Sequence, residues 1–251
     1  MNQKEIVEYI NDLLVIENIK DYGPNGLQVE GDNREVQQIC FAVSITEEVI
    51  QKSIEKKADL IITHHGLFWD KDPRVVRGPM KRKLKLLLES GIASAAYHLP
   101  LDFHSGLGNN YQMAKKLKLK NLKNFAETPK YAEGILGELD AISIDKLSQK
   151  VEQLLDRKPV VLPFGPEKIN KIAIVTGGAQ SYFIKAIEAG ADCYITGEIS
   201  EWVYTMSQEY GVHYISAGHY ATEKFGLQAL AKHMNSQLSI QYDFINTENP
   251  I

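Results

Sequence analysis

Cysteine is nearly absent from this chain, which has only Cys40 and Cys193 among its 251 residues. Both lie inside apolar stretches, where buried free thiols are common. This excludes a small secreted fold held by disulfides and predicts a reduced, cytoplasmic location. No apolar run reaches the ~18–20 residues needed to cross a membrane. The charged first residues also lack the apolar core of a signal peptide, so we expect neither membrane insertion nor secretion.

Positive charge is not in excess either. The chain has 28 Lys and Arg against 32 Asp and Glu, a formal net charge of −4. It therefore has no general basic field for nucleic acid, and we expect none as a partner. Apolar residues make up 44% and charged residues 24%, which excludes disordered and fibrous chains. The length suits one large α/β domain or two interlocked smaller ones.

Short apolar segments alternate with amphipathic ones. Residues 37–45 and 58–65 predict buried strands, and residues 46–57 between them predict a helix with Thr46 as its N-cap. Strand, helix and strand within thirty residues are typical of a parallel βαβ unit. Polar residues 120–128 indicate a crossover between lobes. Further helices are expected at 80–91 and 110–119, and a further strand at 92–98.

The chain contains a weak internal repeat. Residues 53–66 align without a gap with residues 186–199, 133 positions later, and six of the fourteen residues are identical. The repeat predicts two related α/β lobes that carry functional groups at the carboxyl ends of their strands. The alternative is a likeness of composition that any two α/β units share. We assign residues 1–125 and 215–251 to lobe I and residues 126–214 to lobe II.

Candidate metal ligands follow several predicted strands. His64 and His65 close one strand, and His219 and Glu223 lie one turn apart on a predicted helix. Asp102 follows Pro100 in a loop that proline stiffens. A lone strand-end histidine is more often a hydrogen-bonded core residue, so the prediction depends on the whole set. Imidazoles with carboxylates suit zinc, iron, manganese or nickel. We predict two divalent ions per chain, held by His64, His65, Asp102, His219 and Glu223.

Other polar residues carry weaker signals. His98 and His104 flank Asp102 and are candidates for a proton shuttle or for partners of a ligand. Glu198 occupies the repeat position of His65, which fits a hydrogen bond to a ligand, an N-cap or a salt bridge. Basic residues 74–85 indicate a solvated helix face, with a local phosphate-steering patch as the alternative. His213 and His233 are interpreted as incidental.

Four segments together resemble a known family. They are DYGPNGLQVEG, ADLIITHHGLFW, AYHLPLDFHSGLGNN and the stretch TGEISEWVYTMSQEYGVHYISAGHYATEKFGLQAL. The chain resembles the YbgI-type dinuclear metal-centre proteins of the NGG-interacting-factor-three family, widely named GTP cyclohydrolase I type 2 homologues. The resemblance runs from about residue 20 to the last helix. The loop after Tyr22 departs from the family pattern Asp-Asn-x-Gly-Leu at the leading Asp.

The resemblance implies the same five ligands, carried by THHG, HLPLD and GHYATE. It implies two interlinked α/β lobes around a dinuclear metal site, and a toroidal homohexamer. The implied activity is that of a metal-dependent hydrolase acting on a small molecule, with opening of the GTP purine ring as the named reaction. His98 is then the candidate catalytic proton shuttle. The alternative is a metal-binding assembly or regulatory protein without turnover.

Overall fold

The computed structural model describes all 251 residues, and the chain divides into two compact units. Unit 1 comprises Met1–Leu101 and Leu227–Glu248, and unit 2 comprises Asp102–Gly226 and Asn249–Ile251. The sequence-based lobes change at 125/126 and 214/215, so the observed units divide the chain at other points. Residues 102–125 fall in unit 2 because Phe125, Met113 and Ala114 pack in its cores.

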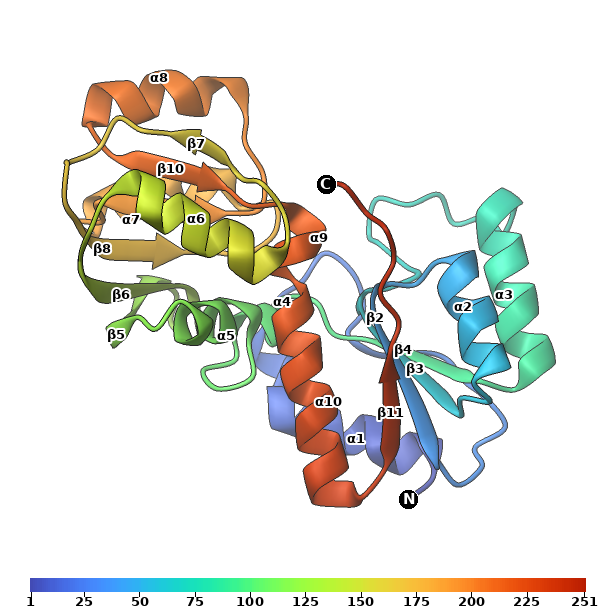
Figure 1. Ribbon diagram of the computed structural model, residues 1–251. Helices are drawn as coiled ribbons and strands as arrows, with labels where there is room; N and C mark the ends of the chain where they lie inside the picture. Colours follow the sequence, from blue (N-terminus) through green and yellow to red (C-terminus); the bar gives the residue numbers. More distant parts are fainter. The chain divides into compact units, whose positions relative to one another are not determined.

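Unit 1 is built on a five-stranded sheet in the order β1-β4-β3-β2-β11. Strands β4, β3, β2 and β11 are parallel, and β1 pairs antiparallel with β4 at one edge. Cys40, Ala42 and Ile61 pack against α2 and α3 on one face, and α1 lies on the other face (Figure 1). The elements are α1 (Gln3–Leu14), η1 (Ile16–Asn18), β1 (Gly26–Val29), β2 (Gln38–Ser44), α2 (Glu47–Glu55), β3 (Leu60–His65), α3 (Gly78–Ser90), β4 (Ala93–Ala96), α10 (Lys224–Leu238) and β11 (Gln241–Phe244).

Unit 2 is built on a six-stranded sheet in the order β5-β6-β8-β9-β10-β7. Strands β8, β9 and β10 are parallel, and β7 pairs antiparallel with β10. Helices α5 and α6 pack on one face, and α7 and α8 pack on the other. The elements are α5 (Asn109–Lys116), β5 (Lys120–Glu127), β6 (Ala132–Ile142), α6 (Ile144–Leu155), β7 (Val160–Leu162), β8 (Ile169–Ile174), η2 (Gln180–Tyr182), α7 (Phe183–Glu188), β9 (Cys193–Thr196), α8 (Glu201–Tyr210), β10 (His213–Ser216) and α9 (His219–Thr222).

The two units repeat one topology, as the sequence predicts. The order α1-β1-β2-α2-β3-α3-β4 in unit 1 returns as α6-β7-β8-α7-β9-α8-β10 in unit 2. In both sheets the first strand of the repeat, β1 or β7, pairs antiparallel with the last strand, β4 or β10. The repeat is therefore structural, and a chance likeness of composition is excluded.

An aspartate matched in the alignment explains part of the sequence repeat. Asp59 accepts hydrogen bonds from the backbone N–H groups of Gln37 and Gln38, at 2.8 and 3.1 Å. Asp192, 133 residues later, accepts from the N–H groups of Asn170 and Lys171, both at 2.8 Å. Each aspartate holds the start of its neighbouring parallel strand. The shared aspartate is therefore a structural device and not part of the candidate site.

We expect Asp59→Ala to destabilise the protein by about 1–3 kcal/mol, because two backbone donors at a partly buried strand start and the Arg34 guanidinium lose their acceptor. Thermal unfolding of the purified variant measures the effect. Asp32→Ala is the control. Asp32 is exposed, and its carboxylate makes a long ion pair with Arg34, with 3.8 Å between the charged atoms. Equal melting temperatures for the two variants would contradict this role for Asp59.

Three local predictions were wrong. Residues 120–128 were predicted as a crossover between lobes, but residues 120–127 form an edge strand of unit 2, β5, paired with β6. Asp102 lies on a short helix, α4 (Leu99–Phe103), and not in a loop. The helix expected to carry both His219 and Glu223 is interrupted, because α9 ends at Thr222 and α10 begins at Lys224. No helix is both long and apolar enough to cross a membrane.

Candidate metal-binding site

Three histidines meet at the carboxyl end of the parallel strands of unit 1. His64 and His65 end β3, and His98 follows β4, the next strand in the sheet. Neighbouring residues of a strand normally point to opposite faces, but the strand ends here, and the rings of His64 and His65 lie 4.9 Å apart between centroids. One ligand nitrogen from each of the three histidines lies within 4.8 Å of the other two. The end of the strand therefore brings both imidazoles of the His-His pair together, with His98 beside them.

The Nδ1 atom of each of these histidines is held by a hydrogen bond. His64 Nδ1 donates to the carbonyl oxygen of Tyr97 at 2.9 Å, and His98 Nδ1 donates to Asp21 Oδ1 at 2.7 Å. His65 Nδ1 lies 2.9 Å from the Ser44 hydroxyl. Carbonyl and carboxylate oxygens only accept, so in the neutral imidazoles of His64 and His98 the Nε2 atom carries the lone pair. A bond of this kind is what orients and polarises a metal-ligating histidine.

Asp21 organises the loop around His98 and was missed by the sequence analysis. Its carboxylate accepts from His98 Nδ1, from the Leu99 N–H at 2.9 Å and from Asn25 Nδ2 at 2.8 Å. Burial opposes ionisation of Asp21, but the hydrogen bonds from His98 and Asn25 outweigh it and lower the pKa of the carboxyl below its ordinary value. Asp21 is therefore charged at neutral pH and fixes the His98 ring.

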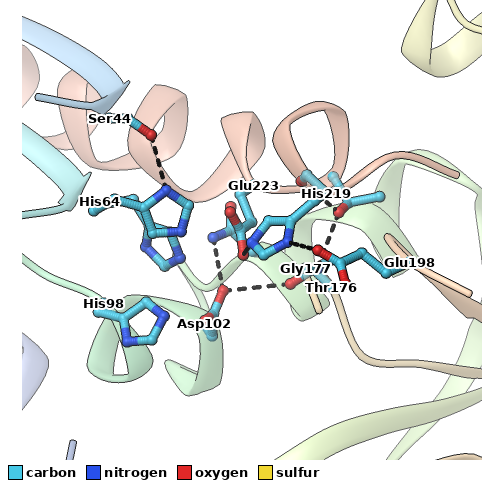
Figure 2. A network of polar contacts seen from close by, with 12 residues as sticks. Ser44, His64, His98, Asp102, Thr176, Gly177, Glu198, His219 and Glu223 are labelled. Carbon is cyan, nitrogen blue, oxygen red and sulfur yellow. Dashed lines mark hydrogen bonds and ion pairs between the residues drawn. The ribbon is translucent and has the colours of Figure 1, made fainter. Parts of the chain in front are cut away.

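Unit 2 carries a second group, made of two carboxylates around one imidazole. His219 Nδ1 lies 2.6 Å from Glu198 Oε1, and His219 Nε2 lies 3.1 Å from Glu223 Oε1 (Figure 2). Burial alone would lower the pKa of His219, but Glu223 and then Glu198 outweigh it and raise the pKa to about 9. The metal-free imidazole is therefore protonated at neutral pH, and a metal ion at Nε2 would have to displace that proton.

This charge arrangement predicts how the stability of the chelator-treated protein depends on pH. The folded-state pKa of His219, about 9, lies above its ordinary value of 6.5. The resulting stabilisation is fully present below about pH 6.5 and is lost as the pH rises through about 9. We expect the melting temperature to fall over that interval, and to fall less in His219→Gln. Differential scanning calorimetry in chelator checks this, and parallel curves for both proteins would contradict it.

Asp102 is held by hydrogen bonds to two other residues of unit 2, Asn109 and Thr176. Its side chain is 6% exposed, and Asp102 Oδ1 accepts from Asn109 Nδ2 at 2.8 Å and from the Thr176 hydroxyl at 3.3 Å (Figure 2). The oxygen of the Asn109 amide accepts from the N–H of Gly226 at 2.7 Å, three residues after Glu223. Asn109 thus ties the helix that carries Asp102 to the start of α10.

Two glycines make room for His219 and Glu223. A Cβ on Gly197 would lie 2.6 Å from His219 Cα and 2.6 Å from the Gly177 oxygen, and a Cβ on Gly177 would run into the Glu223 carboxylate. Gly197 occupies the repeat position of His64. Unit 2 therefore has no space for a side chain where unit 1 places an imidazole.

The remaining histidines bond elsewhere. His104 Nδ1 accepts from the N–H groups of Gly106 and Leu107. His213 bonds Gly165 and Pro166, and His233 Nε2 lies 2.8 Å from the Tyr9 hydroxyl. Of the residues singled out in the sequence, the structure brings His64, His65 and His98 together in unit 1. In unit 2 it places His219, Glu198 and Glu223 in contact and buries Asp102 and Glu223.

The three histidines of unit 1 form a group that can hold a divalent ion. Oriented imidazole nitrogens and buried carboxylates match the preferences of zinc, iron, manganese and nickel better than that of calcium, which takes oxygen ligands alone. Glu223 is 2% exposed, and the protonated imidazole of His219 is its cationic partner in the metal-free protein.

Known proteins share the sequence and the fold of this chain. The family model described as Duf34/NIF3 (NGG1p interacting factor 3) matches residues 1–250. The chain is 40% identical over 252 residues to a Haemophilus influenzae protein named GTP cyclohydrolase 1 type 2 homolog, covering 100% of both chains. It is similar to the solved structure of protein ybgI, of unknown function, with a TM-score of 0.95 and 37% identity over 100% of both chains. A crystal structure from Thermus thermophilus matches with a TM-score of 0.91 and 32% identity, again over 100% of both chains. The chain belongs to the Duf34/NIF3 family.

Proposed function

We propose that this protein is a metal-dependent hydrolase in which His64, His65, Asp102, His219 and Glu223 hold two divalent ions. The observation that carries the proposal is the hydrogen bond that holds Nδ1 of His64, His65 and His219, which leaves Nε2 as the nitrogen that would take a metal ion. Chain connectivity supports a shared function for the two groups. The chain passes between the units at three points, and two of them, Leu101/Asp102 and Gly226/Leu227, lie within four residues of a candidate ligand.

The side chains around the proposed ligands have distinct parts in this reaction. A bound pair of divalent cations supplies Lewis acidity and makes water more acidic. Glu198 positions the His219 ring through Nδ1, as Asp21 does for His98. His98 Nε2 is the atom at which a proton can be taken up or released, because Nδ1 is committed to Asp21. His98 is therefore the proposed proton shuttle.

The names of the relatives give the first substrate to test. Several are called GTP cyclohydrolase 1 type 2 homologs, so GTP with release of formate is the first assay, followed by other nucleotides and phosphoesters. The second candidate function is metal binding without turnover. The homohexamer implied by the family resemblance is part of the proposal and is checked by light scattering.

The test is Glu223→Gln compared with Glu201→Gln. Glu223 contacts His219 Nε2, whereas Glu201 is exposed on the first turn of α8. For a hydrolase we expect Glu223→Gln to abolish turnover by the metal-loaded protein, with Glu201→Gln as active as the wild type. The oligomer should persist in both variants. Wild-type protein that is loaded with metal yet inactive on every compound tested would instead favour the binding function.

A further inference from the structure

A cavity of about 250 Å³ lies beside the three histidines of unit 1. Its lining comes from Pro24 in one loop (residues 21–25), from a second loop (residues 66–77) and from Met80 on α3, and most of the lining residues are apolar. Phe68 and Trp69 supply aromatic surface, and Val75 and Val76 supply aliphatic surface. The charged side chains of its lining are Asp70, Asp72 and Arg74. Apolar walls with a few polar groups are the usual composition of a small-molecule site.

The two loops are fixed to one another. The N–H of Asp70 donates to the carbonyl oxygen of Tyr22 at 2.8 Å. Gln28 bridges the loops, because its Nε2 donates to the Pro24 carbonyl at 2.8 Å and its Oε1 accepts from the Leu67 N–H at 2.6 Å. Gly23 allows this approach, since a Cβ there would run into the Phe68 carbonyl oxygen. The cavity is therefore preformed, and a ligand would not have to order its walls.

Trp69 is the wall between this cavity and the histidines. Its ring meets the His98 ring edge to face, with centroids 5.1 Å apart and an interplanar angle of 89°. The centroid of the His65 ring lies 6.1 Å from that of Trp69. A ring in the cavity would therefore be separated from the candidate ligands by the thickness of one side chain, so the cavity would hold a part of the substrate that does not itself react.

We propose that this cavity is a subsite for a flat heteroaromatic ring of a small-molecule substrate, stacked on Phe68 and Trp69. The inference depends on the proposed function, because it names the class of substrate for that site. The volume lies below the ~300–1,000 Å³ of pockets for whole drug-sized ligands, so it suits one ring system and not a complete nucleotide. Asp70 and Asp72 can accept hydrogen bonds from ring N–H or amino groups, and Arg74 can donate to an acidic substituent.

The chain itself provides the reporter for a test. It has two tryptophans, Trp69 in the cavity and Trp202 on α8, which is 41% exposed. Trp202→Phe leaves Trp69 as the only tryptophan, and Trp69→Phe leaves Trp202 to correct for absorption by the probe. Guanosine 5′-monophosphate is titrated into both proteins, with and without chelator. Ribose 5-phosphate, which has the phosphate and sugar but no ring, is the matched probe.

We expect saturable quenching of Trp69 emission by guanosine 5′-monophosphate and none by ribose 5-phosphate. Phe68→Ala in the same background should bind roughly 5- to 150-fold more weakly, the range expected for one base–aromatic stacking contact. Leu88→Ala is its control, because Leu88 is exposed on α3 and does not line the cavity. If Trp202→Phe does not fold, the difference between wild type and Trp69→Phe gives the same signal.

Metal content, measured in parallel, separates failure of the subsite from failure of the proposed function. Normal metal content without any response of Trp69 to the nucleotide would overturn the subsite alone. A response in protein that binds no metal would support the subsite and count against the hydrolase. Equal quenching by both probes would overturn ring recognition in favour of a phosphate site. A Trp69 signal that follows protein concentration and not the probe would overturn the subsite, because a second copy of the chain would then cover this surface.

Discussion

Protein in which both His64 and His219 are replaced by alanine is expected to retain almost none of the divalent metal that the wild type binds. The double variant removes one nitrogen ligand from each unit, and each of these nitrogens belongs to a ring oriented by a hydrogen bond at Nδ1. Loss of an orienting partner alone costs ~10–100-fold in metal affinity, so loss of two ligands should exceed that. Elemental analysis after dialysis against a defined metal buffer measures the remaining ions.

His233→Ala is the matched control for this experiment. His233 is also an imidazole held by a hydrogen bond, but its partner is the Tyr9 hydroxyl in unit 1, and none of the candidate ligands contacts it in the structure. We expect this variant to keep its full metal content. Full occupancy in the His64→Ala, His219→Ala protein would show that the metal, if bound, lies elsewhere, and the site assignment would fail with it.

Gly197→Ala is expected to lower both the stability of the fold and its affinity for metal. The new methyl group would lie 2.6 Å from His219 Cα, 2.9 Å from His219 N and 2.6 Å from the Gly177 oxygen. All three are main-chain atoms, which cannot rotate away as a side chain can. The loss in free energy of unfolding should therefore reach the upper end of the ~1–3 kcal/mol found for overpacking. Relief of the clash moves His219, and thereby its Nε2. Thermal unfolding and metal titration of the same sample measure the two effects together.

Gly106→Ala separates this effect from the general cost of replacing glycine. A Cβ on Gly106 meets only the His104 ring, at 3.6 Å, which is an ordinary contact, and its backbone does not have a positive φ. This variant should unfold and bind metal like the wild type. If Gly197→Ala behaved in the same way, the tight packing of β9 against the start of α9 would not position His219.

The repeated core of the fold could be predicted from sequence because its signals are local. The apolar runs that become β2, β3, β9 and the last three residues of β8 are buried on both faces, so they form short continuous apolar segments in the sequence. Thr46 was expected to cap α2, and its hydroxyl accepts from the N–H of Val49 at 3.1 Å. The His-His pair, His219 and Glu223 could be selected because each follows directly after such a segment or lies at helical spacing.

The other features depend on contacts between residues far apart in the chain. Asp21 bonds His98 across 77 positions, and nothing near Asp21 marks it as the partner of that histidine. The polar strand β5 was missed because it lies at the edge of its sheet, where few of its side chains are buried. The break at Glu223 was missed because apolar periodicity continues through it, whereas the backbone of Glu223 leaves the helical region at φ −99° and ψ 8°.

The contrast between His64 and Gly197 has a consequence for how such a molecule can change. The two halves share a topology, and equivalent positions hold equivalent aspartates at the strand starts. At the strand ends the residues of the two halves cannot be exchanged, because one half has an imidazole at the position where the other has no room for any side chain. Placing a histidine at position 197 would therefore not give the second half an imidazole trio of its own, since the turn at that strand end would first have to widen. The two halves therefore differ in the spacing of their backbones as well as in their side chains. A point substitution alone would not make one half bind like the other.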